Sequence, residues 1–193
     1  MNKKILSIRQ KGTKTILVSI KLEGDPDVTY TVSEGTYRGI GCPLSGDIID
    51  SEMLEIIERE DGERGALARA LKILSFGDNS ERRLYSKLSQ AKIPQKYARF
   101  AVEECVRLGY IDESRQLERA VLLLSEELLG PKRIAARLTA RGYDIKKIKE
   151  AMSMLSYSGK IDFQKNKQAL IDKKLGREAD IEEKRKLLYK YGY

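Results

Sequence analysis

Regularly spaced basic residues are the side chains of this sequence whose pattern best suits a chemical task. Arg133, Arg137 and Arg141 recur every four residues, so on a helix they form one stripe. Pro131 begins that helix cleanly, because a proline in the first turn needs no N–H partner. Guanidinium groups in such a row can bind phosphates or carboxylates through charge-assisted hydrogen bonds. The stripe therefore predicts a face that binds anions, and the alternative is an ordinary solvated basic surface.

The same basic face occurs a second time in the chain. A shift of 50 residues places one set of cations on another: Arg82, Arg83 and Lys87 on Lys132, Arg133 and Arg137. A merely soluble surface need not keep its sign at equivalent positions, so the duplication favours a binding role. Three further lysines follow Gly142. We expect the partner to contact ten residues: Arg82, Arg83, Lys87, Lys132, Arg133, Arg137, Arg141, Lys146, Lys147 and Lys149.

The groups that most enzymes need are missing from the sequence. There is no histidine, which removes the commonest general base, the Ser-His and Cys-His nucleophile pairs and mixed Cys/His zinc sites. The acidic pairs Glu103-Glu104 and Glu126-Glu127 are adjacent in sequence, so their side chains point to different helix faces and form no carboxylate dyad. We therefore expect a protein that is not an enzyme and that binds no metal or cofactor.

The charge balance points to an acidic partner. The chain has 193 residues, with 37 Lys and Arg against 29 Asp and Glu, a formal net charge of +8. Residues 1–62 carry a net charge of −3, whereas residues 63–193 carry +11. An excess of this size favours nucleic acid or an acidic protein surface as the partner. We expect the contact to lie after residue 62.

Cysteine usage and hydropathy favour a cytoplasmic protein. Cys42 and Cys105 are too few and too far apart for a disulfide framework, and they suit a reducing compartment. No apolar run approaches the roughly 18 residues of a membrane helix. The basic start of the chain is followed by only a short apolar stretch, so we expect no signal peptide. We also expect no contact with membranes and a monomeric state.

The first 62 residues predict a small β-rich module. A half-buried strand is indicated by alternating apolar residues, namely Ile16, Val18, Ile20 and Leu22. Residues 5–8 and 28–32 supply two further strands, so we expect an antiparallel meander. Residues 33–46 are rich in glycine and predict turns, and a helix begins near Asp47 or Asp50, either of which can cap it.

Beyond residue 62 the apolar residues fall at helical spacing and the sequence repeats itself. Under the 50-residue shift, residues 109–112 (Gly-Tyr-Ile-Asp) fall on residues 159–162 (Gly-Lys-Ile-Asp). We expect a mostly α fold of tandem three-helix repeats that form an elongated array, preceded by the β-rich module. The predicted units are 1–62, 63–116, 117–167 and 168–193. The last unit stops where its third helix should begin, so it is either naturally short or truncated.

Two motifs resemble those of a known family. The string at residues 109–113, followed by Arg115, and the string at residues 130–134, followed by Leu138, Arg141 and Gly142, resemble the RecX family of bacterial regulators of the RecA recombinase. The resemblance covers roughly residues 64–193. The chain departs from the family pattern at Gln116 and Leu117, where the family usually has Phe-Ala, and in its short third unit.

The resemblance implies a non-enzymatic protein that binds along the groove of the RecA filament on DNA. Such proteins inhibit strand exchange, ATP hydrolysis and co-protease activity, and so act in DNA repair, recombination and the SOS response. The ten basic residues would then contact acidic filament surface or DNA phosphates. Contacts with single- or double-stranded DNA alone would be weak and indifferent to sequence.

Two other functions remain open at the level of sequence. A helix-turn-helix regulator unrelated to RecA could read a DNA groove with residues 131–141, and it would bind DNA alone tightly and with sequence preference. A protein-interaction scaffold, with the N-terminal sheet as a second docking site, would have no affinity for DNA. The three hypotheses differ in what they predict for DNA binding.

Overall fold

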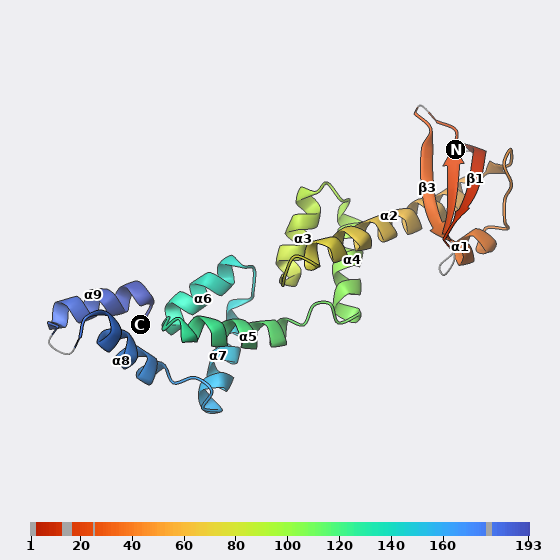
Figure 1. Ribbon diagram of the computed structural model, residues 1–193. Helices are drawn as coiled ribbons and strands as arrows, with labels where there is room; N and C mark the ends of the chain where they lie inside the picture. Colours follow the sequence, from red (N-terminus) through yellow and green to blue (C-terminus); the bar gives the residue numbers. More distant parts are fainter. Residues whose placement is uncertain (1–2, 13–16, 25, 177–178) are drawn as a thin grey trace.

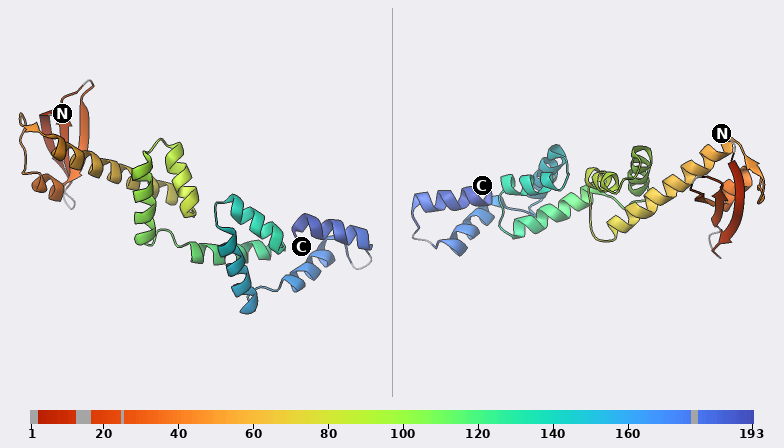
Figure 2. Two further views of the ribbon diagram at one scale, coloured as in Figure 1. Left: turned by 180° about the vertical axis from the view of Figure 1, so that it is seen from behind. Right: turned by 90° about the horizontal axis from the view of Figure 1, so that it is seen from above.

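The protein is elongated (Figure 1). We describe a computed structural model that covers residues 3–12, 17–24, 26–176 and 179–193. The N-terminal sheet lies at one end, and groups of helices follow it in sequence order, as the two further views also show (Figure 2). The accessible surface is 12836 Å² for a mass of 21.9 kDa. A compact monomer of this mass would expose about 9,300 Å². The excess reflects a chain of small units instead of one globule.

The N-terminal sheet has four antiparallel strands in the order β3-β2-β1-β4. Their bounds are β1 (Lys3–Lys11), β2 (Leu17–Leu22), β3 (Val28–Ser33) and β4 (Ile48–Ile49). Val18, Ile20 and Leu22 are buried, which confirms the predicted alternation and the meander. The predicted strand residue Ile16 lies outside the described residues.

A short helix, α1 (Glu34–Gly39), occupies part of the segment that the sequence predicted as turns. It begins there because the Ser33 side chain accepts a hydrogen bond from the Thr36 N–H at 3.2 Å, which caps the first turn. The sequence predicted turns in this segment because of its glycines, and it did not identify Ser33 as a helix cap.

A single long helix, α2 (Ser51–Leu74), connects the sheet to the helical part. It begins at the predicted cap, because Asp50 accepts a hydrogen bond from the Met53 N–H at 2.8 Å. Its N-terminal part packs Ile57 into the core of the sheet module, and its C-terminal part packs Ala70 into the first helical core. The helix runs through residues 61 and 62, so the unit boundary predicted after residue 62 lies inside it.

Carboxylates of α2 cover the exposed edge of strand β3. The Thr31 N–H donates to Asp61 Oδ1 and the Ser33 N–H donates to Glu60 Oε1, each at 2.7 Å. The Tyr30 hydroxyl donates to Glu58 Oε1 at 3.0 Å. Burial and this carboxylate raise the pKa of Tyr30 to about 12. The N–H groups of Thr31 and Ser33 at this edge are therefore satisfied within the chain and are not free to pair with another strand.

The helical part consists of tandem units, as the sequence predicted. Repeat 1 comprises the C-terminal half of α2, α3 (Glu81–Gln90) and α4 (Gln95–Arg107). Repeat 2 comprises α5 (Glu113–Glu126), α6 (Pro131–Ala140) and α7 (Ile145–Tyr157), and repeat 3 comprises α8 (Phe163–Lys174) and α9 (Ile181–Tyr191). Because α5 and α8 begin at Glu113 and Phe163, the boundaries predicted after residues 116 and 167 also fall inside helices.

Each complete repeat has a core of its own. Leu84 and Leu88 of α3 are fully buried in repeat 1, and Ile134 and Leu138 are fully buried at the equivalent places of repeat 2. Among the described residues, no helix is both long enough and apolar enough to cross a membrane.

Candidate functional site

The second helices of the three repeats, α3, α6 and α9, follow one another end to end. Ser80, which caps α3, donates its hydroxyl to the carbonyl oxygen of Arg141 at the end of α6 at 3.0 Å. At the next seam the Gly130 N–H donates to the carbonyl oxygen of Tyr191 at 2.8 Å, and the Lys132 N–H donates to that of Gly192 at 3.1 Å. Each carbonyl end thus meets an amide end, an arrangement that pairs opposite ends of the helix dipoles.

Two glycines make these seams possible. Gly142 has φ +90°, and a Cβ atom there would lie 2.7 Å from Ser80 Oγ. Gly192 has φ +89°, and a Cβ atom there would overlap the backbone of Arg133. The two glycines lie 50 residues apart, which is the spacing of the repeat, but the sequence does not reveal that they form the contact between repeats.

Polar side chains tie repeats 1 and 2 together beside the backbone contact. Glu113 accepts a hydrogen bond from the Glu81 N–H at 3.1 Å and another from Lys147 Nζ at 2.8 Å, which raises the pKa of Lys147. The Tyr143 hydroxyl donates to Gln116 Oε1 at 3.1 Å, and burial raises the pKa of Tyr143. This bond lies within repeat 2, and Gln116, one of the departures from the family pattern, lines a cleft at the seam with repeat 1.

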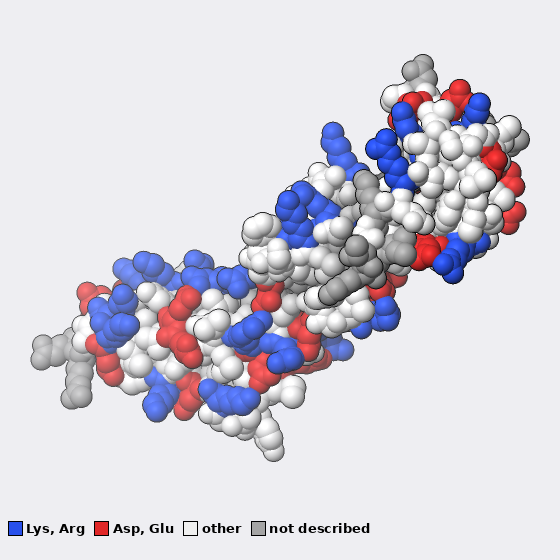
Figure 3. Space-filling view, turned by 45° about the vertical axis from the view of Figure 1, so that its right-hand side comes forward, with Lys and Arg blue, Asp and Glu red and all other residues white. Residues whose placement is uncertain are grey.

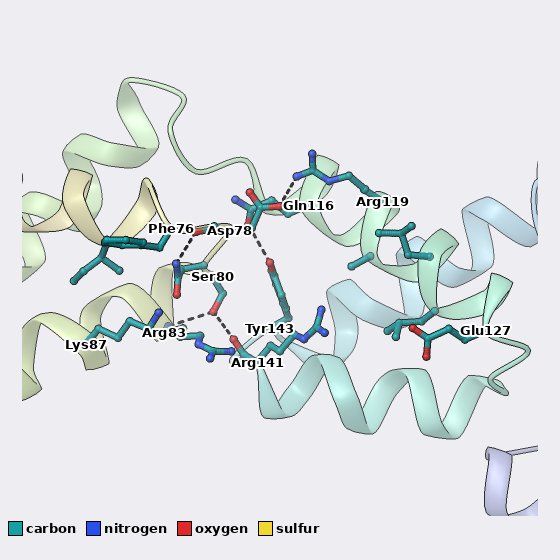
Figure 4. Close-up of a pocket in the computed structure, with 16 residues that line it drawn as sticks. Phe76, Asp78, Ser80, Arg83, Lys87, Gln116, Arg119, Glu127, Arg141 and Tyr143 are labelled. Carbon is teal, nitrogen blue, oxygen red and sulfur yellow. Dashed lines mark hydrogen bonds and ion pairs between the residues drawn. The ribbon is translucent and has the colours of Figure 1, made fainter.

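A cleft of about 410 Å³ opens at the seam between repeats 1 and 2 (Figure 4). Arg83 and Lys87 of α3 and Arg141 of α6 line it together, because the two helices meet here. Phe76, in the loop between α2 and α3, also lines the cleft, and its side chain is 83% exposed. Arg119 lines the cleft from α5 and is paired there with Asp78.

The structure unites some of the ten predicted contact residues and separates others. Arg83, Lys87 and Arg141 share the cleft, and Arg137 lies beside it through an ion pair with Glu127 at 2.7 Å. Lys147 is engaged by Glu113. The other five, which are Arg82, Lys132, Arg133, Lys146 and Lys149, are exposed. Figure 3 shows Lys and Arg side chains along the length of the face that it presents, with acidic side chains between them.

Lys146 and Lys149 belong to a different surface. They border a shallow hollow on α7 together with Ile145 and Met154. The sequence placed these lysines in one set with the α6 stripe because they follow it closely, but the loop between α6 and α7 turns them onto another helix.

Sequence reasoning missed two residues of the cleft, Phe76 and Asn79. The sequence alone assigned no role to the loop at residues 76–80. The available signal was an aromatic residue inside a polar loop, where core packing does not require one. Among the residues that the structure describes, no three His, Cys, Asp or Glu side chains lie close enough to hold a metal ion.

The start of α6 is covered. Its first N–H groups meet the carbonyl end of α9 through Gly130 and Lys132. A recognition helix of the helix-turn-helix type contacts base edges with its N-terminal residues. At the start of α6 the backbone is thus engaged by α9, while the side chains of Lys132 and Arg133 are exposed.

Known proteins resemble this chain in sequence and in fold. Two curated relatives, the regulatory protein RecX of Stenotrophomonas maltophilia strains R551-3 and K279a, are each 30% identical over 131 residues, which is 67% of this chain and 78% of the relative. A crystal structure of a regulatory protein RecX superimposes with a TM-score of 0.70 at 19% identity, over 99% of this chain and 94% of the other. No protein-family model matches the chain. The sequence relatives and the shared fold lead to one conclusion: the chain belongs to the RecX family.

Proposed function

We propose that this protein binds the RecA filament and inhibits its recombinase, ATPase and co-protease activities. The observation that carries the proposal is the end-to-end contact of α3 and α6 through Ser80 and Arg141, which joins the basic residues of two repeats into one face. An elongated array with such a face suits a partner that is itself long and repetitive. Membership of a family whose relatives are named regulatory proteins supports a regulatory role.

The mechanism that we propose is multivalent and involves no chemistry. Each repeat makes weak ionic contacts, and connection within one chain turns the second contact into an intramolecular event with a high effective concentration. A protein bound across several RecA subunits would hinder the subunit movements that strand exchange and ATP hydrolysis require. The proposal places the protein in the cytoplasm, in DNA repair and the SOS response.

The direct test is RecA ATP hydrolysis on single-stranded DNA in the presence of substoichiometric amounts of this protein. The wild type is expected to suppress hydrolysis. The double variant Arg133→Glu and Arg137→Glu is expected to need an about tenfold higher concentration, because it reverses two charges of the basic face. An unchanged far-UV circular dichroism spectrum would show that the helices are intact.

A matched control separates the effect of the basic face on inhibition from the effect of net charge. The double variant Lys72→Glu and Arg99→Glu makes the same change of charge at two exposed residues of α2 and α4 outside the face. It should inhibit like the wild type. An equal loss of inhibition in both double variants would contradict the proposal. So would the absence of inhibition by equimolar wild type at low salt. Tight, sequence-dependent binding to duplex DNA alone would favour the DNA-reading regulator instead.

A further inference from the structure

A continuous row of cations crosses the seam between repeats 1 and 2. Lys87 and Arg83 of α3 are followed by Arg141 at the end of α6, and Figure 4 shows these three in succession along one side of the cleft. Arg137 and Arg133 continue the row along α6 at four-residue spacing. Each helix has ten residues and is about 15 Å long, so the row is long enough for several nucleotides.

The acidic residues at the cleft neutralise only part of this row, since Glu127 pairs with Arg137. Asp78 and Glu127 are the two carboxylates that line it, and each forms an ion pair with an arginine, Arg119 and Arg137 respectively. The four basic residues of the lining outnumber these two carboxylates. The surface beside the cleft is therefore positive, as a site that follows a phosphate backbone requires.

An aromatic ring stands open to solvent at the same cleft. Phe76 is 83% exposed, and Leu123, which also lines the cleft, is 56% exposed. Nothing in the described fold covers the Phe76 ring, so it contributes little to the core. A base can stack on such a ring, and this kind of stacking is tolerant of sequence because every base has a π-face.

A buried acceptor without a partner borders the cleft. Asn79 is 4% exposed, and its Oδ1 atom has no hydrogen-bond partner, whereas its amide nitrogen donates to the Gly77 carbonyl at 2.8 Å. At the seam between repeats 2 and 3 the equivalent residue is Leu129, which is buried in the core of repeat 2. A buried polar atom left unpaired is unfavourable, and it occurs at only one of the two equivalent places, but this oxygen is buried, so a molecule in the cleft does not reach it.

We infer that the cleft holds one unpaired base of single-stranded DNA, stacked on Phe76, with the phosphates along the row from Lys87 to Arg133. Its 410 Å³ falls within the ~300–1,000 Å³ of small-ligand sites. The inference deepens the proposed function, on which it rests for the basic face, by naming DNA as what the face contacts at this seam.

The test is fluorescence anisotropy of a labelled 15-nucleotide oligothymidylate at several salt concentrations, without RecA. Phe76→Ala should weaken binding about 5- to 160-fold, which is the range for loss of one stacked base. It should leave the salt dependence unchanged, because it removes no charge. Arg83→Gln should instead reduce the slope of log K against log salt by about 0.7, the loss of one phosphate contact on a single strand.

Two controls separate the contribution of the stacked base to binding from that of the DNA backbone. A 15-nucleotide strand of abasic residues keeps the phosphates, so Phe76→Ala should not weaken its binding. Tyr189→Ala removes a ring that is 85% exposed on α9, away from the cleft, and should not weaken oligothymidylate binding. Both variants alter exposed side chains, so both should fold.

Three results would overturn the inference: no loss of affinity in Phe76→Ala, an equal loss on the abasic strand, or no binding by the wild type at low salt. The filament proposal is measured separately by RecA ATP hydrolysis. If Phe76→Ala lost oligothymidylate affinity while the wild type left RecA unaffected, the base site would stand and the filament proposal would fail.

Discussion

Close approach between repeats depends on single residues that have no side chain. Gly142 and Gly192 both have left-handed φ angles. Gly142 lies against Ser80 at the start of α3, and Gly192 lies against Arg133 in the first turn of α6. Many helices end in a left-handed glycine for local reasons alone. Here the glycine also leaves room for another repeat, so two separate effects oppose its replacement.

The chain offers a pair of glycines that distinguishes these effects. Gly142→Ala should lose stability through backbone strain of about 1–2 kcal/mol and through overpacking of about 1–3 kcal/mol. Gly159→Ala should show the strain alone, because Gly159 has φ +71° and nothing lies within 4 Å of its Cβ position. Urea denaturation of both variants measures the difference. Equal losses would mean that the seam has room for a methyl group.

At the residue scale, the helix face that the arginines share was predictable from the sequence, and the residues that the fold places beside them were not. The spacing of Arg133, Arg137 and Arg141 determines that they share a helix face, so their exposure follows from local geometry. The meeting of Arg83 with Arg141 depends on a contact between residues 61 positions apart in sequence. No periodicity encodes such a contact. Phe76 was missed for the same reason, because its role depends on what the fold places around a loop.

At the element scale, α2 shows how a tertiary contact keeps a helix continuous. Gly62 lies in the middle of α2, where glycine is about 1 kcal/mol less favourable than alanine. The ring of Tyr97 from α4 packs directly over it, and the Tyr97 hydroxyl donates to the Glu58 carbonyl oxygen at 3.0 Å. The glycine thus lets α4 approach the backbone of α2, and the contact anchors repeat 1 to the helix that carries the sheet.

A second pair of glycines tests this contact. Gly62→Ala should destabilise the protein by about 1–3 kcal/mol, because the new methyl group would overlap the Tyr97 ring, which its hydrogen bond holds in place. Gly65→Ala, one turn later in the same helix and with open space at its Cβ position, should stabilise it by about 0.8–1 kcal/mol. Thermal denaturation of both variants gives the sign of each change. A stabilising Gly62→Ala would contradict the packing role of Tyr97.

The same helix explains why the unit boundaries were harder to predict than the units. Asp61-Gly62 combines a change of charge with a residue that weakens helices, so the sequence indicated a break there. The structure continues α2 across it because Asp61 accepts the Thr31 N–H of strand β3 and Gly62 accommodates Tyr97. Both partners are far away in sequence. The cap of α2 was predictable by contrast, since Asp50 bonds an N–H group only three residues away.

At the scale of the whole molecule, the internal repeat predicted an array, and the array determines the shape. Repeats 1 and 2 have separate cores, and the seam between them is formed by helix ends and polar side chains such as Glu113 and Lys147. Units that meet in this way add length without adding a shared core. The large accessible surface, 12836 Å², is the consequence.

Small-angle X-ray scattering measures that shape in solution. A compact chain of 193 residues would have a radius of gyration of about 16 Å. We expect a value above about 20 Å, because the sheet, α2 and the successive repeats extend in one direction. Gly142→Ala should alter the scattering curve, since the seam at Ser80 must open to admit the methyl group, whereas Gly159→Ala should leave it unchanged. A wild-type value near 16 Å would mean that the repeats fold back on one another. The basic residues of α3 and α6 could then not form one extended face, and the proposed contact along a filament would lose its structural basis.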